Sequence, residues 1–286
     1  MPHKYSLRPM QEEDIPAGMR LKNAAGWNQL EEDWKLFLKA SLDGSMVAEY
    51  QNKVIGTVTT VNYSGRFSWI GMVLVDPEIR RMGIGTTLLK EAIAKAKDKG
   101  TIRLDATPKG KLLYDTLGFK DEYGLNRYEI KDYTHDMSLL KQKKCLEISK
   151  NDLPQIFEYD QYVFGAPRAE ILNSLYKMGR DYAWICRSKK NLQGYCFGRP
   201  GSNFEQIGPI VAENAEIAFS LLCHAMERCK GRPIIIDIPD DQKIFREAVK
   251  DIGFTMQRPF IRMYLGKHPN PGKPEFQFAI AGPEIG

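Results

Sequence analysis

Short apolar runs broken by polar turns, and one stretch of apolar residues at helical spacing, organise the first half of the chain. Residues 46–50 and 54–63 have the pattern of two strands, and the polar residues 51–53 join them as a hairpin. A third apolar run at 67–75 ends at Asp76-Pro77, because proline lacks the N–H that a strand uses for pairing. The next apolar residues fall on one face of a helix: Leu88, Leu89, Ala92, Ile93 and Ala96.

The elements after this helix complete one folding unit. Gly100 suits the C-terminal cap of the helix, and residues 101–106 alternate as a strand. Residues 109–117 predict a short helix and residues 125–130 a closing strand. Strands interleaved with helices predict an α/β (α+β) domain with a mixed central sheet flanked by helices.

The second half repeats the first in the same order. Glu13-Asp14-Ile15-Pro16 recurs as Asn151-Asp152-Leu153-Pro154, and Arg127 and Arg262 each lie eight residues after a Gly-Phe pair. Each match is weak, but their shared order and nearly constant offset predict two copies of one unit. The other matched segments are 54–57 with 192–195, 70–73 with 207–210, and 117–119 with 252–254.

These repeats predict a domain at 1–134, a linker at 135–144, a second domain at 145–267 and a tail at 268–286. In the linker, we expect the His135-Asp136 pair to be solvated rather than catalytic. The tail is more apolar than a flexible end, so we expect it to dock on the body of the protein, near the domain interface. Its apolar residues are Phe276, Phe278, Ile280 and Ile285.

Composition excludes several classes of protein. Of the 286 residues 43% are hydrophobic and 27% charged, which is typical of globular proteins. The 41 Lys and Arg exceed the 36 Asp and Glu by five, a surplus too small and scattered for nucleic-acid binding but sufficient for a small anionic ligand. The first residues lack the apolar core of a signal peptide, and no apolar run approaches the ~18 residues of a membrane span. We therefore expect a cytoplasmic protein that binds neither nucleic acid nor membrane.

The five cysteines contain no Cys-x-x-Cys pair and are odd in number. This predicts buried free thiols, with neither a disulfide framework nor a metal site. The cysteines are Cys145, Cys186, Cys196, Cys223 and Cys229.

The segment from Val75 to Gly85 has the chemistry of an anion site. It lies between a buried strand and an amphipathic helix, where unpaired N–H groups and the helix dipole attract anions. Gly83 and Gly85 lack Cβ atoms, so a pyrophosphate could approach the backbone of residues 81–86, beside Arg80 and Arg81. A Gly-x-Gly also marks ordinary tight turns. Neither a nucleotide P-loop nor a dinucleotide Gly-x-Gly-x-x-Gly motif occurs at a matching position.

This loop resembles that of the GCN5-related N-acetyltransferases, whose Arg/Gln-x-x-Gly-x-Gly/Ala signature is met by Arg80, Gly83 and Gly85. The resemblance extends over residues 5–130 and implies that acetyl-CoA lies with its pyrophosphate on the loop. Its pantetheine would lie between residues 70–75 and 101–106, and a backbone N–H of Leu74 or Val75 would stabilise the oxyanion. The implied cofactor-binding set is Leu74, Val75, Arg80, Arg81, Met82, Gly83, Ile84, Gly85 and Thr86.

The resemblance also implies catalytic residues. Tyr114 stands where many members hold a tyrosine that protonates the departing thiolate, as a phenol can do. Histone-acetylating members carry a glutamate on the strand before the loop, but Trp69 occupies that place here. Glu49 and Asp105 are therefore the candidate bases. Four aromatic residues near the expected acceptor side form either a wall of the acceptor site or ordinary core: Trp27, Trp34, Tyr63 and Trp69.

The second copy lacks the same parts. Residues 211–217 hold no arginine, no paired glycines and two carboxylates that would repel a pyrophosphate, and Val249 replaces Tyr114. The arrangement resembles a tandem subgroup of the family with an active N-terminal domain and a degenerate C-terminal one. The C-terminal copy would then shape the acceptor pocket, dimerise or regulate.

The expected function is transfer of acetyl from acetyl-CoA to a primary amine, without a metal. The acceptor is expected to be a small molecule, while a protein amine, a longer acyl group and a homodimer stay open. The alternative is an acyl-CoA sensor or interaction protein that binds the cofactor without turnover.

Overall fold

The computed structural model of the protein describes residues 5–41, 44–98, 100–131, 143–189, 191–229, 231–267 and 272–286. The linker residues 135–142, with His135 and Asp136, lie outside this part of the chain. The first half runs through β1 (Ser6–Pro9), α1 (Ile15–Ala24), α2 (Glu31–Ala40), β2 (Met46–Tyr50), β3 (Lys53–Tyr63), β4 (Phe67–Val75), α3 (Ile84–Ala96), β5 (Thr101–Ala106), α4 (Pro108–Thr116) and β6 (Lys120–Ile130).

The second half repeats this order and confirms the predicted tandem of α/β units. It runs through β7 (Cys145–Glu147), α5 (Leu153–Phe164), α6 (Ala169–Met178), β8 (Trp184–Ser188), β9 (Asn191–Arg199), β10 (Glu205–Ala212), α7 (Ala215–Met226), β11 (Ile234–Pro239), α8 (Lys243–Asp251) and β12 (Thr255–Leu265). A short strand, β13 (Gln277–Ala279), follows in the tail.

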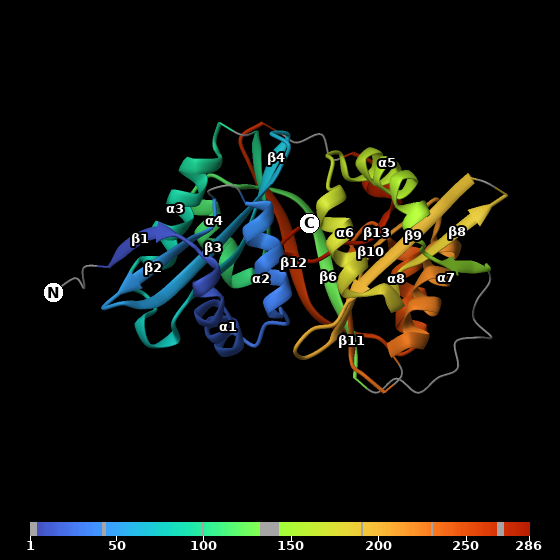
Figure 1. Ribbon diagram of the computed structural model, residues 1–286, viewed down its shortest axis with the longest axis horizontal. Helices are drawn as coiled ribbons and strands as arrows, with labels where there is room; N and C mark the ends of the chain where they lie inside the picture. Colours follow the sequence, from blue (N-terminus) through green and yellow to red (C-terminus); the bar gives the residue numbers. More distant parts are fainter. Residues whose placement is uncertain are drawn as a thin grey trace.

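The strands form one mixed sheet because the two units exchange their last strands. β12 of the second unit lies between β5 and β6, and β6 of the first unit pairs with β11. Figure 1 shows β6 and β12 side by side in the middle of the molecule. β6 begins at residue 120, five residues earlier than the sequence pattern predicted, because residues 120–124 pair with β12 despite their polar character.

Two buried ion pairs join the units at this exchange. Arg262 on β12 contacts both oxygens of Asp105 on β5, at 2.8 and 2.9 Å, and the two residues lie directly opposite in the sheet. Arg127 on β6 makes the equivalent contacts to Asp237 on β11, at 2.7 and 2.8 Å. Each arginine therefore pairs with the aspartate of the other unit.

The helices cover the sheet on both faces. On one face α1, α2, α5 and α6 pack over a single hydrophobic core that both units share, with Trp34, Phe37 and Phe164 among its buried residues. The opposite face carries two separate cores, one under α3 and one under α7 and α8. The shared core and the exchanged strands therefore hold the units together as one body. Within the described residues, no helix has both the length and the apolar character that a membrane crossing requires.

The C-terminal tail runs through the middle of this assembly, where Figure 1 places the C-terminus. β13 pairs with β10, and the residues after it are buried, including Ile280 and Ile285. Two equivalent glycines of the repeat make room for it: a Cβ on Gly208 would lie 2.0 Å from the Ile280 carbonyl oxygen, and one on Gly71 would lie 2.9 Å from the backbone of Glu284. The repeated Ile-Gly segments thus mark two close approaches of the tail.

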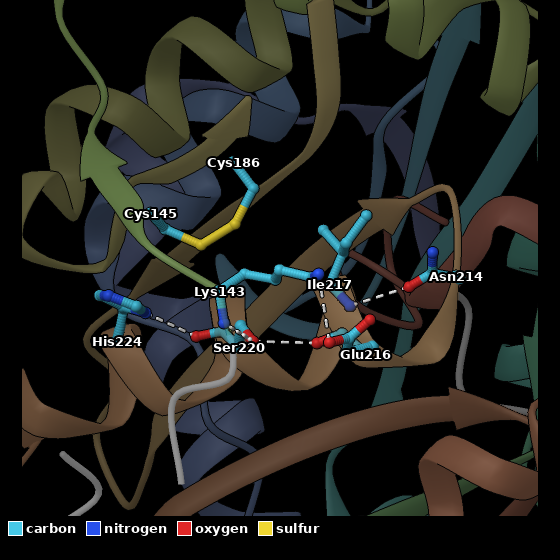
Figure 2. The surroundings of a disulfide bond; sticks show 8 residues. All are labelled: Lys143, Cys145, Cys186, Asn214, Glu216, Ile217, Ser220 and His224. Carbon is cyan, nitrogen blue, oxygen red and sulfur yellow. Dashed lines mark hydrogen bonds and ion pairs between the residues drawn. A yellow bond between two sulfur atoms is a disulfide. The ribbon is translucent and has the colours of Figure 1, made fainter. Parts of the chain in front are cut away.

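The prediction of free thiols is wrong for two of the cysteines. Cys145 on β7 and Cys186 on β8 lie directly opposite each other in an antiparallel pair and form a disulfide (Figure 2). Strand register places their Cα atoms 4.4 Å apart although 41 residues separate them in sequence. Cys196, Cys223 and Cys229 are buried thiols that take part in no disulfide, as predicted.

Alkylation can count these thiols. We expect the unfolded protein to accept three alkyl groups without reductant and five after reduction, as read by intact-mass spectrometry. Five groups without reductant would contradict the disulfide.

The two buried ion pairs at the strand exchange lead to a prediction about stability. Arg262→Met leaves the carboxylate of Asp105, whose side chain has no exposed surface, without its partner, so we expect a loss of about 3–5 kcal/mol in the free energy of unfolding. Denaturant titration measures it. Asp105→Leu combined with Arg262→Met should recover most of the loss, because no buried charge is then unpaired. Lys250→Met, in an exposed pair with Glu247, is the control and should change stability little. An Arg262→Met midpoint equal to that of the control would refute the anchoring role.

Candidate active site

A cavity of about 230 Å³ opens where β4 and β5 part. The two strands pair in parallel only from Phe67 and Thr101 to Trp69 and Arg103, and they diverge beyond that point. The gap lies between residues 70–75 and 101–106, the two segments to which the family resemblance assigned the pantetheine. The cavity is lined by Trp27, Asn28, Gln29, Ile70, Gly71, Met72, Val73, Leu104, Asp105, Thr107, Gly110, Leu113, Tyr114, Arg127, Arg258, Phe260, Pro283 and Glu284.

A bulge in β4 shapes the wall of this gap. The pairing of β4 with β3 shifts register between Leu74 and Gly71, and Met72 adopts a left-handed conformation with φ of 48°. The Thr57 hydroxyl holds the bulge by donating to the carbonyl oxygen of Met72 at 2.9 Å. Gly71, Met72 and Val73 line the cavity, whereas Leu74 and Val75, the predicted oxyanion donors, lie further along the strand and pair with β3.

The loop after β4 leaves a helix start open. Gly83, with φ of 76°, is the N-cap of α3, and no side chain caps this helix. The N–H groups of Ile84, Gly85 and Thr86 are therefore free of a capping side chain. Arg80, Arg81 and Met82 are exposed beside them. The loop combines open N–H groups, a helix dipole and two cationic side chains, which together suit a phosphate-bearing ligand.

An ion pair fixes the base of the loop. Asp76 is buried, its carboxylate accepts a hydrogen bond from the Glu78 N–H, and Arg20 on α1 contacts it at 2.7 Å. Burial alone would raise the pKa of Asp76, but the hydrogen bond from Arg20 and the backbone lower it below its usual value. The charge of the Asp76 carboxylate is therefore compensated by Arg20 and Lys53, and it does not pair with Arg80 or Arg81.

Tyr114 lies on α4 at the cavity wall, so the structure places the predicted proton donor at the gap between the strands. Its ring packs against Phe119 with centroids 5.8 Å apart, and it passes so close to Gly110 that a Cβ there would lie 3.0 Å from the ring. Burial raises the pKa of Tyr114 to about 12. The phenol is therefore protonated at neutral pH and can donate a proton.

The structure does not support either candidate base. Glu49 on β2 is held by Arg8 at 2.7 Å, away from the residues that line the cavity. Asp105 lines the cavity, but both of its oxygens bind Arg262. Burial raises the pKa of Asp105, while Arg262 opposes that shift. Because both oxygens are bound by Arg262, Asp105 serves the ion pair between the units rather than proton transfer.

Glu284 in the tail is a cavity carboxylate that sequence reasoning missed. It contacts Arg199 through one oxygen, and its side chain is nearly inaccessible to solvent. Burial raises its pKa, while Arg199 opposes the shift.

Only one of the four predicted aromatic wall residues lines the cavity. Trp27 does, whereas the other three are buried in the shared core, where Trp69 and Tyr63 support the tail. The Trp69 indole donates to the Pro283 carbonyl at 2.9 Å, and the Tyr63 hydroxyl donates to that of Ile285 at 2.5 Å. Trp34 is also fully buried and packs against Phe37. At the cavity surface, Pro283 and Glu284 of the tail lie where the sequence predicted these rings.

Four of the missed cavity residues come from the second unit and the tail. Arg258 and Phe260 lie on the exchanged strand β12, and Pro283 and Glu284 lie in the tail. The apolar tail and the repeated arginines near residues 127 and 262 were the signals that pointed toward them. Across the described residues, no group of three or more His, Cys, Asp and Glu side chains could hold a metal ion.

The equivalent gap in the second unit is filled. β10 and β11 pair in parallel only from Glu205 to Ile207, and β13 takes the place beyond, pairing with β10 at Ile210 and Val211. Asn214 caps α7 by accepting from the Ile217 N–H at 3.0 Å (Figure 2). Val249, at the position that corresponds to Tyr114, lies on α8 and is fully buried in the core of the second unit. The open slot, the open helix start and the phenol thus all belong to the first unit.

Comparison with known proteins agrees with this architecture. Residues 9–119 match the model of the Acetyltransferase (GNAT) family, and residues 156–279 match that of an Acetyltransferase (GNAT) domain. The chain is 25% identical to holothin acyltransferase of Pseudoalteromonas sp. strain SANK 73390, covering 92% of this chain and 88% of that protein. It is also 25% identical to the uncharacterized N-acetyltransferase YitH of Bacillus subtilis strain 168, covering 92% and 93%.

Solved structures show the same fold. A protein of Pyrococcus horikoshii assigned as an acetyltransferase superposes with a TM-score of 0.83 at 23% identity, over 99% of this chain and 96% of that one. A tandem GNAT protein from the clavulanic acid biosynthesis pathway superposes with a TM-score of 0.67 at 13% identity, over 93% and 100%. With a match to the family in each half and acyltransferases among its relatives, the chain belongs to the GCN5-related N-acetyltransferases (GNAT) and carries two GNAT domains.

Proposed function

We propose that the chain transfers an acetyl group from acetyl-CoA to a primary amine, with one site per chain in the N-terminal unit. The observation that carries this proposal is the contrast between the two units. The first has an open gap between β4 and β5, with an uncapped helix start beside it and Tyr114 on its wall. In the second, β13 and Asn214 occupy the equivalent gap and helix start.

The residues of the first unit fit acetyl-CoA. The N–H groups at 84–86 with Arg80 and Arg81 would hold its pyrophosphate, and the gap between residues 70–75 and 104–106 would hold the pantetheine. Acetyl-CoA supplies an acetyl thioester, which is activated toward amines. The acetyltransferase match over residues 9–119 supports this use of the loop.

Tyr114 and Glu284 divide the proton transfers in this proposal. Glu284 takes a proton from the acceptor ammonium on the carboxylate oxygen that does not contact Arg199, because burial raises its pKa; both oxygens of Asp105, by contrast, are bound by Arg262. The amine nitrogen then bonds to the acetyl carbon while the carbon–sulfur bond breaks. Tyr114 donates its proton to the sulfur and regains one from the nitrogen, so the reaction releases one proton overall.

The relatives do not assign an acceptor to this chain. Holothin acyltransferase is named for holothin, and the tandem GNAT structure for the clavulanic acid pathway. The cavity of about 230 Å³ is smaller than the ~300–1,000 Å³ of drug-sized pockets and also has to hold the thioester end of acetyl-CoA, so the space left favours a small amine.

A charge-removal variant tests the loop. Arg80→Ala with Arg81→Ala should weaken CoA binding at least about 10-fold, because charge-assisted contacts to phosphate are stronger than neutral ones. Calorimetry at two salt concentrations measures it, and the wild-type affinity should fall with salt. Lys90→Ala with Lys97→Ala removes the same charge from the exposed side of α3 and should bind CoA as the wild type does. Equal affinity of both double variants would exclude the loop as the phosphate site.

Tyr114→Phe tests turnover. We expect kcat to fall about 100-fold or more while CoA affinity stays unchanged, because the variant loses only the proton donor. The assay follows free thiol release from acetyl-CoA with an amine panel. Because the pKa of Tyr114 is about 12, wild-type kcat should not decline through loss of the phenol proton up to about pH 10. Tyr162→Phe, at an exposed tyrosine, is the control. If no amine raises thiol release above the Tyr114→Phe level, the protein binds acyl-CoA without turnover and the proposal fails.

A further inference from the structure

Four charged side chains line the cavity, and three of them have an ionic partner. Asp105 pairs with Arg262, Arg127 with Asp237, and Glu284 with Arg199. Each of these pairs is almost completely buried, so its charges compensate one another within the protein. The fourth is Arg258.

Arg258 has no compensating partner among the residues that the structure describes. Its guanidinium forms no hydrogen bond or ion pair with these residues, and its Nε is buried without a hydrogen-bond partner. Asp237 attracts Arg258 only at longer range, because its carboxylate accepts hydrogen bonds from Arg127 and Gln206 instead. A buried donor without a partner costs free energy, which a bound acceptor atom would recover.

The chain holds this side chain in place by packing. The pairing of β12 with β6 shifts register between Met256 and Arg258, so the strand carries an extra residue just before Arg258. Its guanidinium lies over the Phe260 ring at 5.2 Å, and that of Arg127 lies over the same ring at 5.4 Å. Two cations therefore stand beside one aromatic ring at the cavity wall, and only Arg127 has an anion. Burial and the neighbouring Arg127 lower the pKa of Arg258, because both disfavour its positive charge.

We propose that the acceptor is a small primary amine that also carries a carboxylate, and that Arg258 binds this carboxylate. Guanidinium and carboxylate match in planar, two-bond geometry. The thioester end of acetyl-CoA would fill part of the cavity of about 230 Å³, and the space left beside Arg258 suits a molecule of amino-acid size, whose ammonium would face Glu284. This inference names the substrate class of the site proposed above and rests on that proposal.

Equilibrium binding tests the inference without turnover. The probes are N-acetylglycine, N-acetyl-β-alanine and N-acetyl-4-aminobutyrate, each compared with its primary amide by calorimetry in the presence of CoA. We expect at least one acid to bind about 10- to 100-fold more tightly than its amide, the range of a charge-assisted contact. Equal affinity of acids and amides, or no binding of any probe, would overturn the proposal.

Variants of Arg258 locate the effect. In Arg258→Gln, the affinities of the acid and its amide should lie within about twofold of each other. Arg258→Lys should keep part of the preference for the acid, because lysine retains the positive charge but cannot form two parallel hydrogen bonds to a carboxylate. Neither should unfold the protein, since Arg258 has no hydrogen bond to lose. Arg228→Gln, at an exposed arginine paired with Glu147, is the matched control and should keep the full preference. A preference that survives in Arg258→Gln would also refute the assignment.

Two further experiments distinguish this inference from recognition of a phosphate and from the proposed function itself. N-acetyl-2-aminoethyl phosphate tests a phosphate, and tighter binding than all three acids would overturn the assignment to carboxylates. The thiol-release assay compares the free amino acids with their amides. Turnover of the amides at the rate of the acids would refute the inference while leaving the proposed function intact. Absence of all turnover, with acid-selective binding that depends on Arg258, would instead refute the proposed function alone.

Discussion

The reciprocal pairing of Arg262 with Asp105 and of Arg127 with Asp237 is the constraint on which the rest of the structure depends. Each pair is buried and joins directly opposite positions of two units, so it fixes the register of an exchanged strand. A charge left alone at either place would be costly, whereas a paired one specifies a single arrangement. The exchange brings β12 to the edge of the first unit's gap, and with it the Arg258 side chain.

The tail acts on both units because of this exchange. β13 fills the gap between β10 and β11 in the second unit, and the residues after it pass Gly71 and reach the cavity of the first. Carbonyl oxygens of the tail accept from Trp69, Tyr63 and Arg199, all of them buried. One segment therefore closes one slot and completes the wall of the other. The second unit shapes the site through these contacts, which is one of the roles that the sequence left open for it.

Local features were predictable from the sequence, and contacts between units were not. The hairpin of β2 and β3, the strand before the loop and α3 follow from apolar spacing and from Gly and Pro, so their positions came out nearly as expected. An apolar strand pairs equally well within its own unit or with the other, so the pattern could not reveal the exchange. The Cys145–Cys186 disulfide and the cavity position of Arg258 depend on register between distant strands, and were missed for that reason.

One departure from symmetry between the units lies at the cavity. If Arg127 and Arg262 are equivalent, the counterpart of Arg258 in the first unit is Tyr123, whose hydroxyl accepts from Arg262 at 2.5 Å. In the Arg262–Asp105 pair, the neutral side chain of Tyr123 therefore contacts the arginine. In the Arg127–Asp237 pair, Gln206 donates to the aspartate instead, and the position equivalent to Tyr123 carries a second cation, Arg258. If position 258 served only stability, a tyrosine there, as at position 123, would be sufficient. The unpaired guanidinium therefore requires an explanation outside the fold, and the open cavity beside it supplies one.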